Sequence, residues 1–142
     1  MKTALLNSFS LAESAEMQPD DKGRLADIAI ARSEGWAEYF ANEVKHGRAR
    51  LSHVLHDGRA IGTVLWRIET DVERELVIMS VASSDPRLSI SAFLAQAVDA
   101  LAAAEQCDTA RFHTIRPGLV KFAHGKGWHT SEIVLRKSYH VA

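Results

Sequence analysis

The most informative segment of this chain is Ala110-Arg-Phe-His-Thr-Ile-Arg-Pro-Gly-Leu-Val-Lys-Phe-Ala-His-Gly-Lys-Gly-Trp-His-Thr-Ser-Glu-Ile-Val-Leu-Arg-Lys-Ser-Tyr139. It opens with a short β-prone run around Phe112 and Ile115, which predicts a strand. Pro117 then suits the first turn of a helix, where its missing N–H is not needed. The apolar residues within 119–123 are three and four apart, so we expect about two turns of helix.

The end of this segment predicts two further strands. Gly125 and Gly127 should end the short helix, because glycine readily adopts the left-handed conformation found at helix ends. Trp128 then begins an extended run, and Ile133-Val-Leu135 forms another. The predicted order is therefore strand, short helix, glycine-aromatic pair, strand and strand.

The residues before this segment predict a mixed sheet. Asp57-Gly58 joins two alternating runs within 49–68, which is typical of a hairpin with a two-residue turn. A third strand is expected over 75–82 and a long amphipathic helix over 90–101. The strands on either side of this helix should be parallel and joined by a right-handed crossover. They should end near Ala82 and Ile115 and splay apart, leaving a slot beside the start of the helix.

The second hairpin strand and the N-terminal region carry further expectations. On the second strand, Ile61, Thr63 and Leu65 should share one face, and both faces are apolar enough to be covered. Residues 3–10 predict a first strand. Two helices are expected near 21–33 and 36–46, with Gly35 as the break between them.

Composition sets the broad class of protein. The chain has 142 residues, 46% of them hydrophobic, and a net charge of −1, which predicts one globular domain over 1–142 and no nucleic-acid partner. Cys107 is the single cysteine, so no internal disulfide is expected, which fits a reducing compartment and the cytoplasm. No segment approaches the ~20 apolar residues of a membrane span. The apolar N-terminal run is interrupted by Asn7, Ser8 and Ser10 and does not predict export.

The order of elements in 110–139 resembles the C-terminal half of the GNAT superfamily of N-acetyltransferases. In that family a short helix carrying Phe-Tyr is followed by polar residues, Gly-Phe and a last strand that ends in a basic residue. The matching residues here are Phe122, Ala123, Gly127, Trp128 and Leu135-Arg-Lys137. The resemblance covers roughly 20–139. It implies an α+β fold, a single GNAT-like domain with a mixed twisted sheet flanked by helices, and an N-acyltransferase that takes its acyl group from acetyl-CoA.

The strand-loop-helix unit from 76 to 101 is where this resemblance places the cofactor. A helix N-terminus presents free N–H groups and a partial positive charge, which suits phosphate. The family carries Arg/Gln-x-x-Gly-x-Gly/Ala there, and the matching segment is Arg87-Leu-Ser-Ile-Ser-Ala92. Arg87 and Ala92 agree with the motif, Ile90 replaces its first glycine, and Ser89 and Ser91 offer hydroxyl groups. A simple helix cap by Ser89 is the alternative.

A second feature of the family is a bulge in the strand before that loop, where the backbone pairs with the pantetheine arm of CoA. The matching residues here are Val81, Ala82 and Ser83.

Acid-base residues depart most from the family pattern. Many members use a tyrosine directly after the phenylalanine of the last helix to protonate the leaving thiolate, but this chain has Ala123 there, which transfers no proton. His124 and Tyr139 are the remaining candidates for a catalytic acid. No Asp or Glu lies within 76–82 to act as a base, and Glu75 stands at the edge of that strand. The seven histidines lack the spacing of a known metal site, so no metal is expected.

Two functions follow from this reading. The first is an acyl-CoA-dependent N-acyltransferase acting on a small-molecule or peptide amine. The second is a GNAT-fold binding or structural module without catalysis, of the kind known among tailed phages and small bacterial proteins. The missing motif glycine and tyrosine favour the second. Edge pairing or exchange of the final strand also predicts a homodimer.

Overall fold

A computed structural model of the chain describes residues 2–4, 9–26, 34–84, 90–113 and 117–131, together with 135, 137 and 139. In these residues six strands form one sheet in the order β1-β2-β3-β4-β5-β6. The strands are β1 Lys2–Ala4, β2 Phe9–Ser14, β3 Arg50–His56, β4 Arg59–Glu69, β5 Glu75–Ser83 and β6 Thr109–Phe112. The helices are α1 Pro19–Ala26, α2 Glu34–Lys45, α3 Ile90–Ala104 and α4 Pro117–His124.

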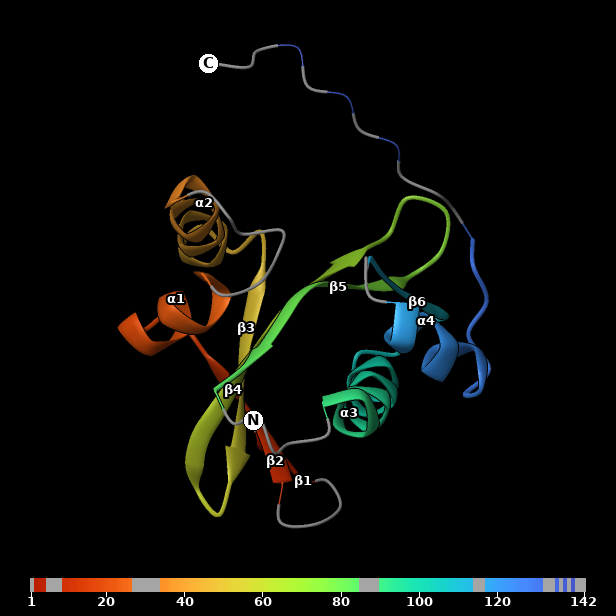
Figure 1. The fold of residues 1–142 in the computed structure, drawn as a ribbon, viewed down its shortest axis with the longest axis horizontal. Coiled ribbons are helices and arrows are strands. Elements are labelled where there is room, and N and C mark those ends of the chain that lie inside the picture. The colour runs from red at the N-terminus through yellow and green to blue at the C-terminus, as the bar shows by residue number, and fades with distance from the viewer. Residues whose placement is uncertain are drawn as a thin grey trace.

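The sheet is mixed, as the sequence predicts. Neighbouring strands from β1 to β5 are antiparallel, and β5 and β6 are parallel with α3 between them in the chain. Helices α1 and α2 lie on one face of the sheet, and α3 and α4 lie on the other (Figure 1). This arrangement covers both faces of the central strands, which explains why β4 is buried without interruption from Ile61 to Trp66.

Two apolar cores lie on the two faces. The core on the α3 side joins Ala97, Val98 and Leu101 of the helix to residues of four strands, among them Val64, Trp66, Leu76 and Ile78. The core on the α1/α2 side joins Leu25, Phe40 and Val44 of the helices to Leu51, Leu65 and Ala82 of the sheet.

The hairpin between β3 and β4 forms at the predicted turn. Asp57 and Gly58 both have positive φ, 51° and 80°, which matches the two-residue turn favoured by right-handed strand twist. The prediction that Ile61 shares a face with Thr63 and Leu65 is wrong. Val54 pairs with Gly62 while Leu55 pairs with Ala60, so Ile61 is an extra residue and packs into the core on the α3 side.

The N-terminal region differs from the prediction in two ways. The strand expected over 3–10 is two strands, β1 and β2, which pair with each other. Gly35 lies inside α2, which begins at Glu34, and so does not separate two helices. Of the helix expected over 21–33, the structure describes α1 up to Ala26, and 27–33 lie outside the described residues.

The strands predicted after α4 are wrong for the residues that the structure describes. Residues 128–131, 135, 137 and 139 form no strand. The Trp128 N–H donates to the Ala123 carbonyl, so this residue completes the end of α4 and does not start a ladder. Leu135 is 90% exposed, which no paired, half-buried strand position would be.

Candidate active site

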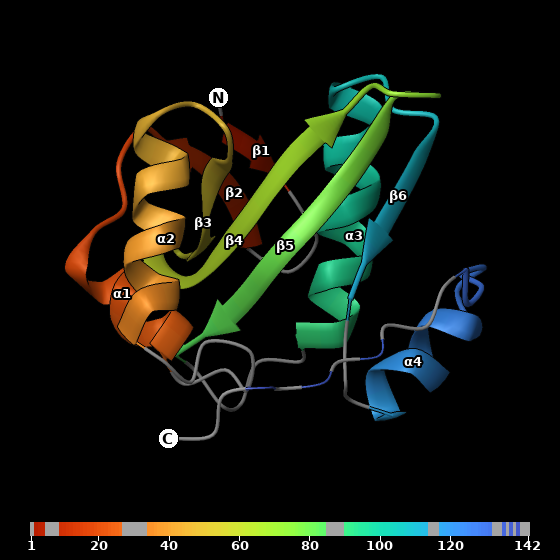
Figure 2. The same cartoon turned by 90° about the horizontal axis from the view of Figure 1, so that it is seen from above.

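The parallel pair β5 and β6 separates part of the way along its length. The two strands pair from Glu75–Thr109 to Ile78–Phe112, and β6 then ends while β5 continues to Ser83. Figure 2 shows the two strands diverging from this point, with the first turn of α3 near the open end. The last five residues of β5, about 16 Å of strand, therefore have no β6 partner among the described residues. This is the slot that the sequence predicts, although Ile115 itself lies outside the described residues.

A bulge in β5 lies where the two strands part. Leu65 of β4 pairs with Ser80, but the next residue of β4, Trp66, pairs with Ile78, so Met79 is the extra residue. The resemblance placed the bulge at Val81, Ala82 and Ser83, which is two to four residues too far along the strand. Pairing with β4 fixes the bulge, and the side chains of a strand carry little trace of such a register change.

Met79 and Ser80 both lie on the α1/α2 face of the sheet. Met79 packs against the core on that face, and Ser80 pairs in register with Leu65, which belongs to the same core. Ser80 is 8% exposed, and its Oγ has no hydrogen-bond partner among the described residues. Sequence reasoning missed this residue, since a serine in an apolar strand gives no sign of whether its hydroxyl is satisfied.

The start of α3 agrees with the prediction. The helix begins at Ile90, with Ser91 and Ala92 in its first turn, and this turn contains no acidic residue. The free N–H groups and the partial positive charge of the helix are therefore not neutralised from within the turn. Arg87 and Ser89 lie outside the described residues. The family motif has a glycine where Ile90 stands, and the first N–H groups of a helix have no partner within the helix whatever the side chain.

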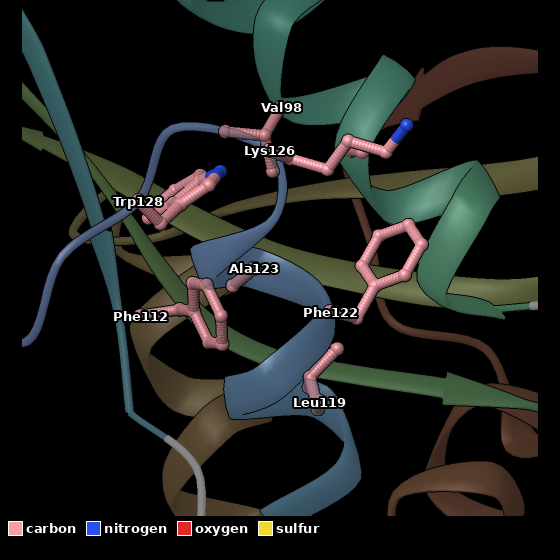
Figure 3. A pocket seen from close by; sticks show the side chains of 8 residues that line it. Val98, Phe112, Leu119, Phe122, Ala123, Lys126 and Trp128 are labelled. Atoms are coloured by element: carbon pink, nitrogen blue, oxygen red, sulfur yellow. The ribbon is translucent and has the colours of Figure 1, made fainter.

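An apolar pocket lies between α3, α4 and the end of β6 (Figure 3). Ala95 and Val98 line it from α3, and Phe112 and Trp128 meet edge to face with ring centroids 4.9 Å apart. The remaining lining residues are Leu119, Phe122, Ala123 and Lys126. Ala123, where many GNAT proteins carry tyrosine, is buried here, so at this position the wall offers a methyl group and no hydroxyl.

The two predicted catalytic acids do not meet in the structure. His124 is an exposed residue in the last turn of α4, and its Nε2 lies 3.1 Å from Oγ1 of Thr130. Tyr139 is 77% exposed, with the Lys137 ammonium 5.0 Å from its ring centroid. Gly127 has a φ of +89° and ends α4 as predicted, whereas Gly125 does not adopt the left-handed conformation.

Glu75 does not serve as a base at the bulge. It lies at the closed end of the slot, in register with Thr109, and its carboxylate is 2.7 Å from a guanidinium nitrogen of Arg111. Met79 lies four positions further along the strand, about 13 Å away. The other guanidinium arm of Arg111 binds Glu69 at 2.9 Å, so both carboxylates at this end are paired.

A buried polar cluster fixes α1 to the sheet beside this site. The Asp21 carboxylate is fully buried and accepts hydrogen bonds from Arg24, His53 and Thr63. Arg24 also reaches the Ala60 carbonyl and the Ser84 hydroxyl, which follows directly after β5. The cluster therefore ties the helix to β3, to β4 and to the residue that follows β5.

The pKa of Asp21 reflects two opposing effects. Burial of the carboxyl by itself raises the pKa, because it disfavours the charged form. Hydrogen bonds from His53, Thr63 and the Gln18 N–H outweigh burial, and the pKa of Asp21 lies below its ordinary value. Burial raises the pKa of the Cys107 thiol, which therefore stays protonated and is a poor nucleophile at neutral pH.

The described residues offer neither a metal-binding cluster nor a membrane-spanning helix. They contain no group of three or more His, Cys, Asp or Glu side chains able to hold a metal ion. No helix among them is both long and apolar enough to cross a membrane.

Comparison with solved structures identifies the architecture. A transcriptional regulator from Bacillus halodurans superposes with a TM-score of 0.66 at 16% identity, over 92% of this chain and 99% of that chain. The aminoglycoside N-acetyltransferase AAC(6')-Iy in complex with CoA superposes with a TM-score of 0.62 at 14% identity, over 94% and 95% of the two chains. The chain has the GNAT fold.

A third similar structure is an aminoglycoside acetyltransferase from an uncultured soil metagenomic sample in complex with sisomicin, with a TM-score of 0.64 at 13% identity over 96% of this chain and 98% of that chain. A scan against models of protein families found no match, and a search of curated proteins found none either. At these identities the likeness establishes the GNAT fold and leaves the reaction to be argued from the chain's own residues.

Proposed function

We propose that this GNAT-fold chain is an N-acyltransferase that transfers the acyl group of acetyl-CoA to an amine. The observation that carries the proposal is the separation of β5 from β6 after Ile78–Phe112. Beyond this point β5 has no partner in β6 among the described residues, and the backbone over 79–82 can pair with the amide groups of a pantetheine arm, much as a strand edge pairs with an added peptide. The similar fold of an acetyltransferase in complex with CoA supports this assignment.

Two parts of the site would hold the cofactor. The backbone of the β5 end would hold the pantetheine arm, and the first turn of α3, together with the loop before it, would hold the pyrophosphate. The residues proposed for these contacts are Val81, Ala82, Ser83, Arg87, Ser89, Ile90, Ser91 and Ala92. When bound, the thioester supplies an activated acyl carbon at the point where the strands part.

The residues of the chain would then position the amine and the thioester and transfer the proton between them. The amine nitrogen forms a bond to the acyl carbon, the carbon–sulfur bond breaks, and the proton lost by the amine balances the one gained by the leaving thiolate. We propose His124 or Tyr139 as the donor of that proton. Turnover of His124→Ala and Tyr139→Phe separates the two, and unchanged rates in both variants would remove both donors while leaving the enzyme.

Binding of CoA is the first test. A ligand at 100 times its dissociation constant stabilises the folded state by about 2.7 kcal/mol, so acetyl-CoA should raise the melting temperature and give a saturable calorimetric titration. An absence of any shift at millimolar CoA would contradict the proposal.

The alternative is a GNAT-fold binding module without catalysis. It is favoured by Ile90 at the position of the motif glycine and by the buried Ala123 on α4. The fold of a transcriptional regulator is also similar to this chain. A protein that neither binds CoA nor turns over any amine would have this second function.

We further propose that the protein works in the cytoplasm as a homodimer. The single cysteine suits a reducing compartment. Among the described residues β6 pairs with β5 alone, so its outer edge can accept a strand from a second copy. Analytical ultracentrifugation should then give twice the mass of the chain.

A further inference from the structure

The hydroxyl of Ser80 is a buried polar group without a partner. The side chain is 8% exposed, and within the described part of the chain no donor or acceptor reaches its Oγ. Burying a hydroxyl in this way destabilises the folded state, and an orphaned group of this kind needs an explanation. Another serine of the sheet, Ser52, shows the usual outcome, since its Oγ accepts a hydrogen bond from Nε1 of Trp66 at 3.1 Å.

The position of Ser80 gives that explanation. It follows the bulge residue Met79 and comes two residues after Ile78, the last residue of β5 that pairs with β6. The bulge places two consecutive side chains, those of Met79 and Ser80, on the α1/α2 face. A buried hydroxyl therefore lies on this face, at the level of β5 where β6 ends.

The surroundings of Ser80 decide which ligand suits it. Leu65 lies in register beside it, and Val77 before it and Ala82 after it lie on the same face; all three are apolar and buried. Charged residues lie beyond these positions in both directions along the face: Arg67 and Arg111 are in register with Val77, and the Asp21 carboxylate binds Thr63, which is in register with Ala82. All of these charges are paired: Arg67 binds Glu69, Arg111 binds Glu69 and Glu75, and Asp21 binds Arg24 and His53.

An ammonium group is disfavoured in such a place, because desolvation among apolar side chains lowers the pKa of an amine. The neutral amine is the form with a lone pair available for attack. The proton can then be lost to solvent before the amine binds, and no carboxylate is needed at the bulge, where within 76–82 the sequence has none.

Resting on the acyltransferase function proposed above, we infer that Ser80 Oγ accepts a hydrogen bond from the acceptor nitrogen, and that this subsite takes a primary amine on an apolar carbon skeleton. The hydrogen bond fixes the direction of the lone pair toward the slot. The apolar side chains around it accommodate the carbon chain of the amine. A polycationic acceptor would have to bring further charges into this apolar surrounding and is selected against.

The test compares Ser80→Ala with the matched control Ser52→Ala. Ser80→Ala removes an unsatisfied hydroxyl, so its melting temperature should equal or exceed that of the wild-type protein, and its affinity for acetyl-CoA should not change. Its kcat/KM for hexylamine and 2-phenylethylamine should fall about tenfold, the value of one hydrogen bond at the upper end of the neutral range. Ser52→Ala leaves the Trp66 N–H without a partner, so it should lower the melting temperature and keep its turnover below that temperature.

Each outcome decides the inference. The wild-type protein should acylate hexylamine more efficiently than spermidine, and the reverse preference would overturn it. The inference would also be overturned if Ser80→Ala lowered the melting temperature as Ser52→Ala does, or if Ser80→Ala left kcat/KM unchanged. A wild-type protein that binds acetyl-CoA but acylates none of the three amines contradicts the amine subsite alone. One that binds no CoA contradicts the proposed function and this inference with it.

Discussion

At the scale of single residues, Asp21 contributes most clearly to the stability of α1. Its carboxylate is fully buried and holds Arg24, His53 and Thr63 together. Asp21→Asn keeps the size of the side chain and removes its charge, which leaves the Arg24 guanidinium uncompensated in a buried place. We expect a loss of about 3–5 kcal/mol in the free energy of unfolding, measured by urea denaturation.

The neighbouring residue provides the control for this change. Asp20 is exposed in the same first turn of α1, so Asp20→Asn should change the free energy of unfolding by less than about 0.5 kcal/mol. Equal effects of the two substitutions would show that the charge at the start of the helix, and not the buried cluster, carries the stabilisation.

Gly62 is needed where β3, β4 and β5 approach closely. A Cβ at this position would lie 3.0 Å from the Ala82 carbonyl oxygen and 3.2 Å from Cβ of Val54. Because the first of these atoms is backbone, Gly62→Ala should destabilise the protein by about 1–3 kcal/mol in urea denaturation. Gly23 in α1 has no atom within 4 Å of such a Cβ, so Gly23→Ala should stabilise the protein by up to about 1 kcal/mol. Similar losses in both variants would contradict this account.

At the scale of elements, local chemistry explains which predictions succeeded. The Asp57-Gly58 turn needs two positive φ angles, and Asp-Gly is a residue pair that adopts them readily, so the turn can be predicted from the sequence. The period of α3 is likewise a local property. The strands expected after α4 required pairing partners elsewhere in the sheet. The apolar character of the segment does not show whether such a partner exists, and Leu135 is in fact exposed.

The features of the candidate site differ in the same way: one follows from the local sequence, and others depend on strand pairing. The slot follows from the predicted crossover, since two parallel strands separated by a helix share one end of the sheet. The bulge at Met79 and the orphaned hydroxyl of Ser80 depend on register with β4, where Leu65 and Trp66 pair with residues two apart. No pattern in β5 itself reports that register, and so these features required the structure.

The end of α4 offers a prediction at this scale. Gly127 has a φ of +89°, and the N–H of Trp128 donates to the Ala123 carbonyl, which holds Trp128 against Phe112 in the apolar pocket. Gly127→Ala forces a Cβ into the left-handed conformation and should cost about 1–2 kcal/mol in the free energy of unfolding. Gly125 lacks a positive φ, so Gly125→Ala should have a much smaller effect, and an equal loss in both would argue against the conformational cause.

At the scale of the whole molecule, stability should depend on acid through the carboxylates whose pKa values are lowered in the folded state. Hydrogen bonds lower the pKa of Asp21 despite its burial, and the hydrogen bond from Arg50 lowers the pKa of Glu13. The unfolded chain therefore binds protons at a higher pH than the folded chain does. As the pH is lowered through the range in which the unfolded chain holds more protons, the free energy of unfolding decreases. The stabilisation is complete above the unfolded pKa values, about 4, and is lost as the pH falls through the folded ones.

Asp21 should dominate this dependence, because Glu13 and Arg50 are both partly exposed and solvent screens their interaction. Urea denaturation at pH 7, 5, 4 and 3 should give a free energy of unfolding that is level between pH 7 and 5 and falls steeply below. Asp21→Asn removes the titrating group, so its curve should start lower at pH 7 and decline less between pH 5 and 3. A variant curve parallel to that of the wild-type protein would mean that acid unfolds the chain through other carboxylates and that the Asp21 cluster is not the acid-sensitive link between α1 and the sheet.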